Sequence, residues 1–402
     1  MKILFNDPSF SFETLRTLGF ACDGGADLGE IIITASKIPD GDEDAWLREW
    51  KTLADRIAQQ GEDSLSKGHH VSAREAFLRA SNYYRVAEFY RRFDPVNDQE
   101  VISVSRLSRE TFQKAALLLD TPVENVLIPY EDVMLPAYFF KADATDSQRP
   151  TIIYNNGFDS TREEAYFAIA AAALRRGYNV LAFDGPGAGE PLREDNMLFR
   201  VDWEAVITPV LDYTYSRKDV CKDQIALFGY SLGALQIVRA AAFDSRVGAL
   251  ILNDGMYDFY DANTIEMPPF LLKLLDNGQG EIFDQVIRML MKNNTSLRWA
   301  IQNGLWTFGA TTPSAYLKET KAWTLDGFAD KVKAPTLVLE AEEDKFLQGQ
   351  AQKVVDSLLG ATTLVKLYTS EGAGEHCHEG AMRRLTQIIF DWLDETFSNN
   401  IH

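Results

Sequence analysis

The sequence predicts an α/β protein with a mostly parallel, doubly wound sheet, preceded by a helical domain and interrupted by an inserted helical lid. From about residue 123 onward, short apolar runs alternate with helical segments, which is typical of a parallel sheet covered on both faces. Residues before about 120 are mostly helical in pattern, and a helical, aromatic-rich stretch breaks the alternation. The expected parts are an N-terminal helical cap (1–120), a first core part (121–255), the lid (256–325) and a second core part (326–402).

The N-terminal part contains two strong helical segments. Trp46, Trp50, Leu53 and Ile57 follow helical spacing. In the second segment, which extends to Tyr90, Ser72 stands three residues before Glu75 and could cap the helix. Its aromatic residues exceed what one buried face needs. Either the helices form a hairpin that packs on the neighbouring domain, or some of these aromatics wall a substrate pocket; the candidates are Tyr83, Tyr84, Phe89 and Tyr90.

The core elements follow in order. Two strands around a turn open the core, followed by a buried-type strand, a helix and another buried-type strand, and the alternation then continues through the remaining strands to an amphipathic C-terminal helix. The predicted strands are 123–130, 133–141, 151–154, 178–184, 225–228, 247–252, 334–340 and 362–367, and the predicted helices beside them are 162–176, 234–243 and 379–396.

Composition excludes several function classes. The chain has 402 residues, of which 46% are hydrophobic, so it can bury a large core. Its net charge of −19 would repel phosphate backbones and anionic lipids, which argues against a nucleic-acid or membrane partner. No apolar run reaches the roughly 18 residues that a membrane span needs.

Two further observations bear on location. The first residues contain no long apolar stretch or small-residue cleavage site, so they do not resemble a signal peptide. The three cysteines, Cys22, Cys221 and Cys377, are odd in number and widely spaced, which argues against a disulfide framework. We therefore expect a cytoplasmic protein.

The most informative motif is Gly229-Tyr230-Ser231-Leu232-Gly233, which stands between an apolar strand and an alanine-rich helix. A serine hydroxyl is a weak nucleophile unless the backbone presents it beside a base, and this sharp strand-to-helix turn does so. The alternative is a glycine-rich turn that only packs a strand against a helix. The strand before the motif and the helix after it favour Ser231 as a nucleophile.

The base and its orienting acid are expected after later strands. Among the five histidines, His376 and His378 lie in a glycine-rich loop after the last predicted strand, and we favour His376. Asp344 and Glu343 follow the preceding strand, and we favour Asp344 because its shorter side chain suits a tight contact with the imidazole. The order serine, acid, histidine is that of the α/β-hydrolase fold, and each candidate stands at the carboxyl end of a strand, where doubly wound sheets place their sites.

The remaining site residues are expected around this triad. An oxyanion hole would combine the N–H of Leu232 with that of Phe158, in the loop after strand 151–154. Within the lid, Tyr257 and Trp306 are candidate substrate contacts by position alone.

Three competing motifs are weaker. Gly185-Pro186-Gly187-Ala188-Gly189 lacks the spacing of a nucleotide-binding loop. His376-Cys377-His378 lacks the paired ligands typical of a zinc site. Cys377 as nucleophile would leave Ser231 in its elbow unexplained. The sequence thus predicts neither a cofactor nor a metal.

Several segments together resemble one branch of the α/β-hydrolases, and the similarity covers nearly the whole chain. That branch contains the 2,6-dihydroxypseudooxynicotine hydrolase and the fungal yellowish-green-type polyketide-shortening hydrolases. The segments are Asn156-Gly157-Phe158-Asp159-Ser160, 184–190, the elbow at 229–233, 372–377 and the helical leader with Ser72-Ala73-Arg74-Glu75-Ala76 and 80–85.

The resemblance implies hydrolysis of a carbon–carbon bond next to a ketone, with Ser231, Asp344 and His376 as the triad. The two aromatic-rich helical parts fit a small-molecule substrate that is aromatic or apolar. It strengthens the choice of His376, because the histidine before the cysteine is the base in that branch. His378 departs from the pattern, since glutamine is common there.

The branch also resembles ordinary esterases, so a carboxylester or lactone hydrolase is the alternative. A non-catalytic binding protein is a remote second alternative. A homodimer formed through the helical leader is left open.

Overall fold

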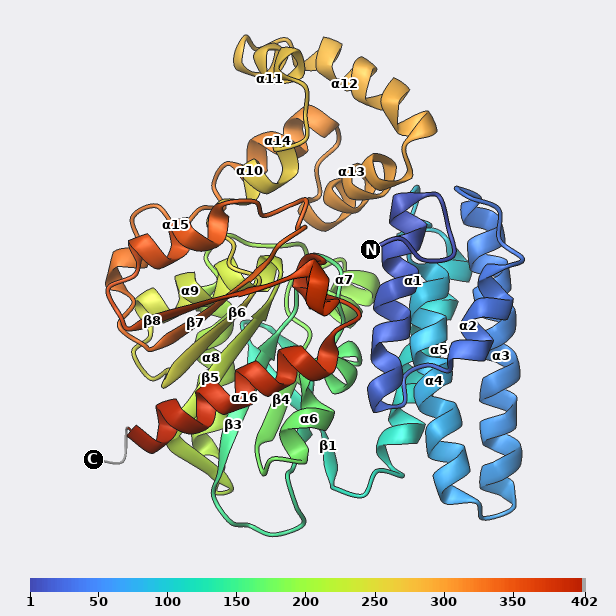
Figure 1. Cartoon of the computed structure of the whole chain (residues 1–402), viewed down its shortest axis with the longest axis vertical. Coiled ribbons are helices and arrows are strands. Elements are labelled where there is room, and N and C mark those ends of the chain that lie inside the picture. The colour runs from blue at the N-terminus through green and yellow to red at the C-terminus, as the bar shows by residue number, and fades with distance from the viewer. Residues whose placement is uncertain (400–402) are drawn as a thin grey trace.

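The computed structural model describes residues 1–399 and contains one eight-stranded sheet with the order β1-β2-β4-β3-β5-β6-β7-β8 (Figure 1). β1 and β2 form an antiparallel hairpin, β2 is antiparallel to β4, and all later pairs are parallel. The carboxyl ends of β3 to β8 therefore meet at one edge. The strands are β1 (Val123–Tyr130), β2 (Val133–Phe140), β3 (Arg149–Asn155), β4 (Asn179–Phe183), β5 (Val220–Tyr230), β6 (Ala249–Asn253), β7 (Thr336–Ala341) and β8 (Thr362–Leu367).

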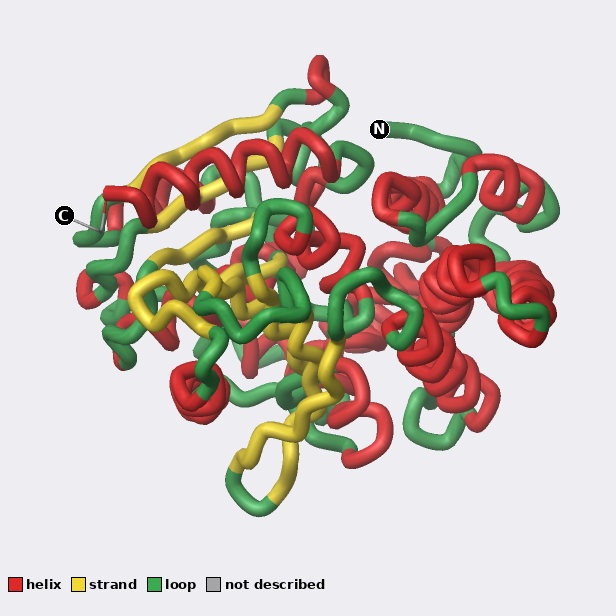
Figure 2. The backbone as a smooth tube through the Cα atoms, turned by 90° about the horizontal axis from the view of Figure 1, so that it is seen from below, coloured by secondary structure: helices red, strands yellow, loops and turns green. Residues whose placement is uncertain are grey.

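Helices cover both faces of this twisted sheet (Figure 2). On one face, apolar side chains of α8, α9 and α15 pack on the strands; on the other face, α6 and α16 do so, together with aromatic residues of the N-terminal helices. This confirms the predicted α/β-hydrolase fold. The helices are α6 (Ala171–Leu174), α7 (Gly189–Asp195), α8 (Glu204–Ser216), α9 (Leu232–Phe243), α15 (Gln350–Ser357) and α16 (Met382–Asn399).

The predicted helix over 162–176 is shorter in the structure. A wide helical turn occupies Tyr166–Ala170 and continues into α6. The segment before it is diverted because Arg162 bonds to Asp184, after β4, through both its N–H (2.8 Å) and its guanidinium (3.3 Å). The helical backbone runs from residue 164 to 174, so the predicted helix is present and is two residues shorter at each end than expected.

The N-terminal helices lie beside the sheet and have their own aromatic core, which includes Trp46, Trp50, Tyr83 and Tyr90. The second strong helix begins at His70, with His69 as its N-cap, so the expected cap at Ser72 was wrong. The turn at Gly68 lets the helix begin three residues earlier than the capping pattern suggests. The helices are α1 (Pro8–Gly19), α2 (Leu28–Ala35), α3 (Glu43–Ser66), α4 (His70–Glu88) and α5 (Gln99–Ala116).

The helical insertion, α10 to α14, lies between β6 and β7 above the carboxyl edge of the sheet (Figure 1). Its two ends meet at the core, where the Asp258–Thr324 bridge, Phe259 N–H to Trp323 O (2.9 Å) and Leu325 N–H to Tyr257 O (3.0 Å) join them. The helices are α10 (Phe259–Thr264), α11 (Pro269–Asp276), α12 (Gly280–Leu290), α13 (Thr295–Phe308) and α14 (Pro313–Thr320).

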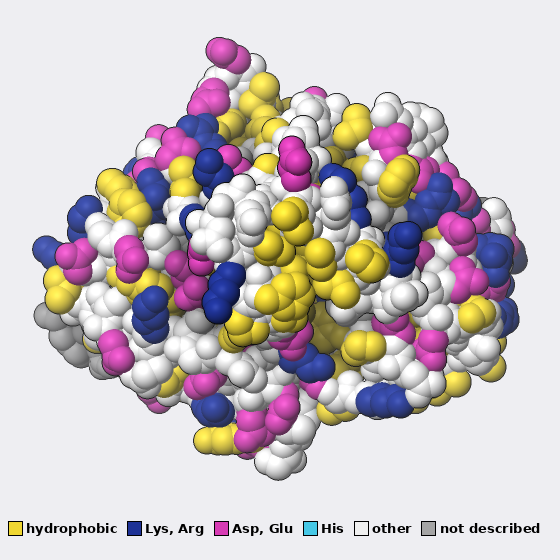
Figure 3. Space-filling view, turned by 90° about the horizontal axis from the view of Figure 1, so that it is seen from above, with side chains coloured by type: hydrophobic (Ala, Val, Ile, Leu, Met, Phe, Trp, Pro, Cys, Tyr) yellow, Lys and Arg dark blue, Asp and Glu magenta, His cyan; other side chains and the backbone are white. Residues whose placement is uncertain are grey.

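The outer face of the insertion is partly apolar. Hydrophobic side chains gather near the middle of the molecule when it is seen from above, where the insertion lies (Figure 3). The exposed large apolar residues of this region are Ile265, Phe270, Ile282, Met289 and Leu290. Within residues 1–399, the longest helices are too polar to cross a bilayer.

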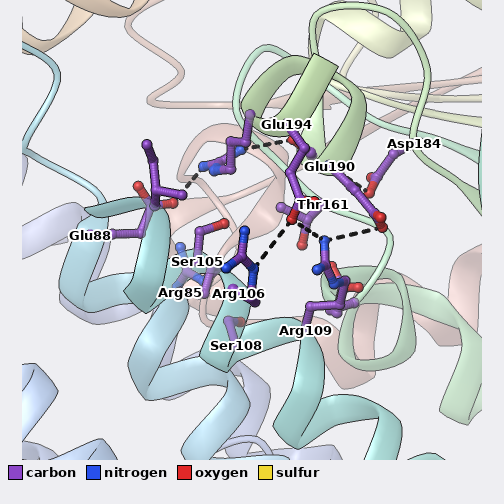
Figure 4. Close-up of a pocket in the computed structure, with 14 residues that line it drawn as sticks. Arg85, Glu88, Ser105, Arg106, Ser108, Arg109, Thr161, Asp184, Glu190 and Glu194 are labelled. Atoms are coloured by element: carbon purple, nitrogen blue, oxygen red, sulfur yellow. Dashed lines mark hydrogen bonds and ion pairs between the residues drawn. The ribbon is translucent and has the colours of Figure 1, made fainter. Parts of the chain in front are cut away.

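The contact between the N-terminal helices and the core is rich in ion pairs. Charged side chains line a narrow pocket there, formed by α4, α5, α7 and the loops after β3 and β4 (Figure 4). Arg109 pairs with Glu194 at 2.7 Å and with Glu190 at 3.3 Å. Because charges buried without partners are costly, this pairing specifies how the two parts dock.

Candidate active site

Ser231 stands at the turn between β5 and α9 with φ 53° and ψ −117°. Few non-glycine residues adopt such a conformation, and strain of this kind is typical of functional turns. The turn is possible because its glycines have no side chains: a Cβ on Gly229 would lie 2.4 Å from Gly233 O, and one on Gly233 would lie 2.6 Å from Asn156 O. Both distances are far below contact.

This close approach gives a stability prediction. Gly233→Ala should lower the free energy of unfolding by about 3 kcal/mol, because backbone atoms rather than flexible side chains oppose the new methyl group. Chemical denaturation measures the change. The control is Gly29→Ala in α2, where the new Cβ would lie 3.5 Å from its nearest neighbour; it should leave stability unchanged or slightly raised. Equal stability of the two variants would contradict the close packing of the elbow.

The structure brings Ser231, His376 and Asp344 together from three loops. Ser231 Oγ lies 2.9 Å from His376 Nε2, and His376 Nδ1 lies 2.6 Å from Asp344 Oδ2. Asp344 also accepts hydrogen bonds from the N–H groups of Phe346 (2.8 Å) and Leu347 (3.2 Å), which hold its carboxylate in place. With the imidazole neutral, Nδ1–H donates to Asp344 and Nε2 accepts from the serine hydroxyl.

The electrostatics of this pair are mutual. Burial is the largest single effect and disfavours the charged imidazolium, but the interactions with Asp344 and, after it, Cys377 together raise the pKa of His376 well above its usual value. Burial opposes ionisation of Asp344 as well, yet His376 and the bonds to Phe346 N–H lower the pKa of that carboxyl. Such an arrangement stabilises an imidazolium that has accepted a proton from Ser231.

The two rival candidates lie elsewhere. Glu343 is exposed. His378 is fully buried and turns away from Ser231: its Nδ1–H donates to Ala373 O at 2.9 Å, and its Nε2 lies 2.7 Å from Asp254 Oδ1. Burial is the largest single effect and opposes the charge on His378, but Asp254 and the hydrogen bond to Ala373 together raise the pKa of His378.

Asp254, directly after β6, was missed by sequence reasoning. Its Oδ2 accepts the N–H of Cys377 at 2.9 Å and lies 3.9 Å from His376 Nδ1. Cys377 and His378 both have positive φ, 55° and 58°. Asp254 thus holds a loop that two consecutive left-handed residues bend. Its place at the end of a buried strand was the available signal, since the same rule located Asp344.

The loop after β3 places Phe158 beside the nucleophile. A Cβ on Gly157 would lie 2.6 Å from Tyr230 O and 3.3 Å from Ser231 Cβ, so the loop passes directly over the elbow. Among residues 1–399, the backbone N–H of Phe158 has no hydrogen-bond acceptor. Leu232 is the first residue of α9, where helical N–H groups lack intrahelical partners. Both expected oxyanion donors therefore lie next to Ser231.

The expected substrate contacts at Tyr83 and Tyr84 need correction. Both side chains are buried in the core of the N-terminal helices. The Tyr83 hydroxyl donates to Glu30 at 2.7 Å, and the Tyr84 hydroxyl donates to Asp55 at 2.7 Å. These aromatics hold α2, α3 and α4 together and do not wall the site, which is the helical-hairpin alternative.

Tyr257 and Trp306 are also largely buried, at 7% and 8% exposure. The Tyr257 hydroxyl donates to Asp326, and Lys353 lies over its ring. The Trp306 ring packs against the guanidinium groups of Arg92 and Arg193, each 5.4 Å from the ring centroid. The structure thus places Trp306 between the insertion and the N-terminal helices.

An aromatic cluster surrounds Phe158 instead. Its ring centroid lies 5.4 Å from that of Phe259 and 6.0 Å from that of Trp299, both in the insertion. Phe199 and Phe308 follow at 6.4 and 6.5 Å. The aromatic texture of the lid was visible in the sequence, but the residues that meet Phe158 could not be selected from it.

Glu379 connects the histidine loop to the nucleophile. It is 1% exposed and accepts a hydrogen bond from the hydroxyl of Tyr230, the residue before Ser231. Burial raises the pKa of Glu379 to about 7, although Arg16 favours the ionised form.

This shift predicts a pH-dependent stability. A folded pKa of about 7 against an ordinary value of 4.5 means that the folded state retains a proton that the unfolded chain releases. The free energy of unfolding should therefore fall as pH rises from 4.5 to about 7, by about 3 kcal/mol from this group. Glu379→Gln, which is neutral, should remove that fall and be more stable than the wild type at pH 8. Urea denaturation at pH 5 and pH 8 tests this, with the exposed Glu395→Gln as control; identical slopes in all three proteins would contradict it.

Three potential metal-ligand atoms, on Asp254, His376 and Cys377, lie within 4.8 Å of one another. His376 already uses both ring nitrogens, toward Asp344 and Ser231, and Asp254 Oδ2 accepts from Cys377 N–H. Burial raises the pKa of the Cys377 thiol to about 12, so it is a poor thiolate ligand or nucleophile. The donor set does not favour a metal.

The family model of the Alpha/beta hydrolase family matches residues 156–385. Hydrolase LUC6 of a Fusarium species is 35% identical, covering 99% of this chain and 98% of its own. The 20-hydroxy-prefusarin hydrolase FUS2 of Gibberella moniliformis is 34% identical, covering 99% of each. The crystal structure of the 2,6-dihydroxy-pseudo-oxynicotine hydrolase has the same fold, with a TM-score of 0.76 at 22% identity over 95% of this chain and 96% of that one.

Proposed function

The chain belongs to the Alpha/beta hydrolase family, and from this premise we propose that it is a serine hydrolase that cleaves a carbon–carbon bond next to a ketone through an acyl-enzyme. The observation that carries the proposal is the unbroken hydrogen-bonded path from Ser231 through His376 to Asp344, with distances of 2.9 and 2.6 Å. Such a path activates a serine hydroxyl on many unrelated folds.

In the first step, His376 Nε2 accepts the proton of Ser231 Oγ as the oxygen attacks a substrate carbonyl carbon. The N–H groups of Leu232 and Phe158 donate to the resulting oxyanion. Collapse of the tetrahedral adduct breaks the bond to the α-carbon, whose electron pair is delocalised as an enolate. The His376 imidazolium returns its proton to this leaving group, and the acyl group remains on Ser231.

In the second step, His376 accepts a proton from water, whose oxygen attacks the carbonyl carbon of the acyl-enzyme. The second tetrahedral adduct collapses by breaking the bond between this carbon and Ser231 Oγ, and the His376 imidazolium returns the proton to Ser231 Oγ. The products are a carboxylic acid and the protonated carbon fragment. Asp344 stabilises the imidazolium in both steps. A carbon leaving group is poorer than an alkoxide, so this chemistry benefits from a site where bulk water does not weaken the fixed N–H dipoles.

The substrate class is argued from the surroundings of Phe158. Aromatic rings from both the core and the insertion gather around it, which favours an aromatic or apolar polyketide-like β-diketone. The full-length similarity to a hydrolase named for 20-hydroxy-prefusarin supports a small-molecule substrate of this general kind. We propose that the helical insertion, whose two ends meet at the core, acts as the lid over the site.

Matched substrates test the scissile bond. Aryl 1,3-diketones and the corresponding aryl esters and lactones, which share one acyl group, are incubated with the protein, and products and intact protein mass are recorded. We expect diketone cleavage to a carboxylic acid, with a transient acyl adduct on Ser231. Rapid ester or lactone cleavage with the diketones left intact would favour the carboxylester or lactone hydrolase.

A further inference from the structure

The loop that carries Phe158 is fastened from both parts that flank the core. From the N-terminal helices, Arg16 Nη1 lies 3.1 Å from Asp159 Oδ1. From the insertion, Asn303 Nδ2 donates to the carbonyl oxygen of Phe158 at 3.2 Å. Within the loop, the N–H of Gly157 donates to Ser160 Oγ at 2.8 Å. Nothing in the sequence links Asn303, 145 residues away from Phe158, to this loop.

These bonds restrict one peptide unit in particular. The N–H of Gly157 belongs to the peptide before it, and the carbonyl of Phe158 belongs to the peptide after it. Both flanking peptides are therefore fixed, while the central peptide carries the free N–H beside Ser231. Because Gly157 has no Cβ to restrict its rotation, the central peptide could otherwise turn its N–H away.

Asn303 is itself held rigidly. It is 2% exposed, and its Oδ1 accepts from Arg92 Nε at 3.3 Å. Arg92, also 2% exposed, is fixed by the carboxylate of Glu88 at 2.5 Å, which in turn binds Arg193 of α7 at 2.5 Å. The path Arg193–Glu88–Arg92–Asn303 thus runs from the core through the N-terminal helices into the insertion.

Helix α13 is fixed at several other points. The indole N–H of Trp299 donates to Phe89 O at 2.9 Å, and the two rings stack at 4.7 Å. At its other end, the N–H of Phe199 donates to Thr307 O at 2.9 Å. The position of Asn303 relative to Phe158 is therefore set by packing on both sides.

We propose that Asn303 is a positioning residue for the oxyanion hole: its amide holds the Phe158 carbonyl, and thereby keeps the Phe158 N–H directed at the oxygen that develops negative charge. The inference rests on the proposed serine mechanism. It gives the insertion a part in transition-state stabilisation, and not only in enclosing the substrate. The productive geometry then depends on the insertion and the N-terminal helices being docked.

Asn303→Asp tests this with little change of shape. An aspartate can still accept from Arg92, but its carboxylate cannot donate to Phe158 O. We expect the rate of Ser231 phosphonylation by a fluorophosphonate to fall by about 10- to 100-fold, somewhat less than the loss of a whole oxyanion donor. Gln302→Glu, the same change of amide to carboxylate one residue earlier on α13, is the matched control and should stay within twofold of the wild type.

A second readout separates positioning from a general structural effect. A phenylalkyl trifluoromethyl ketone forms a serine hemiketal whose oxyanion needs the hole, whereas the corresponding alcohol binds without forming one. Asn303→Asp should weaken inhibition by the ketone as much as it slows labelling, and should leave protection by the alcohol within twofold. Equal weakening of both would indicate a merely structural role and overturn the inference.

Asn303→Ser serves if the aspartate variant fails to fold, since its side chain is too short to reach Phe158 O, and it should show the same pattern. Labelling at the wild-type rate in folded Asn303→Asp or Asn303→Ser would overturn the inference alone. A wild-type protein that the fluorophosphonate does not label at Ser231 would overturn the proposed function and, with it, the inference.

Discussion

Replacing Ser231 by alanine should reduce turnover by about 10⁴-fold or more and abolish covalent labelling by a fluorophosphonate. The reason is geometric: Ser231 Oγ is the atom 2.9 Å from His376 Nε2, and no other hydroxyl occupies the strained turn between β5 and α9. The measurements are kcat/KM on the best substrate of the panel and intact mass after labelling.

Ser147→Ala, which removes an exposed hydroxyl, is the control for the alanine substitution and should behave as the wild type. The melting temperature of Ser231→Ala should stay the same or rise. Alanine packs much as serine does, and the substitution removes one polar group. Turnover above a few per cent of the wild type would show that another group performs the attack.

Asp344→Asn should have the second largest effect, a fall in kcat of about 10⁴-fold with little change in overall structure. The asparagine amide would donate to His376 Nδ1 across the 2.6 Å contact. That bond favours the tautomer with its proton on Nε2, which cannot accept the serine proton. The loss of the carboxylate also removes the charge that raises the pKa of His376.

Glu343→Gln is the matched control, because it makes the same change at the adjacent, exposed position. Steady-state kinetics of both variants decide between the two acids that the sequence offers. If Asp344→Asn retained more than about a tenth of the wild-type kcat, the orienting acid would have to be another group; Asp254, 3.9 Å from His376 Nδ1, would be the next carboxylate to replace.

The sheet and the residues at its carboxyl edge could be predicted because one rule covers them all. Parallel strands end at a common edge, so a serine, an acid and a histidine that each follow a strand must approach one another. The structure indeed brings Ser231, Asp344 and His376 within hydrogen-bonding distance. The sharp turn at Ser231 could also be predicted, because the glycines on either side of it are needed where backbone segments pass so closely.

The neighbours of the helices could not be predicted in the same way. Helix α4 is buried nearly all round its last turns, so periodicity does not tell which partner each aromatic residue meets. The sequence therefore leaves Tyr83 and Tyr84 as candidates for either a pocket wall or a helical hairpin, and in the structure they hold α2 and α3. No sequence pattern marks Asn303 as a site residue, because the role of an asparagine within a helix depends on its tertiary contacts.

The insertion leaves and rejoins the core at a single point, where Asp258 and Thr324 pair. In evolutionary terms, such a segment is exchangeable: a lineage can lengthen, shorten or replace it while the catalytic framework is inherited intact. The hydrogen bond from Asn303 to the carbonyl oxygen of Phe158 limits that freedom. A replacement segment must supply its own amide donor to the same carbonyl oxygen.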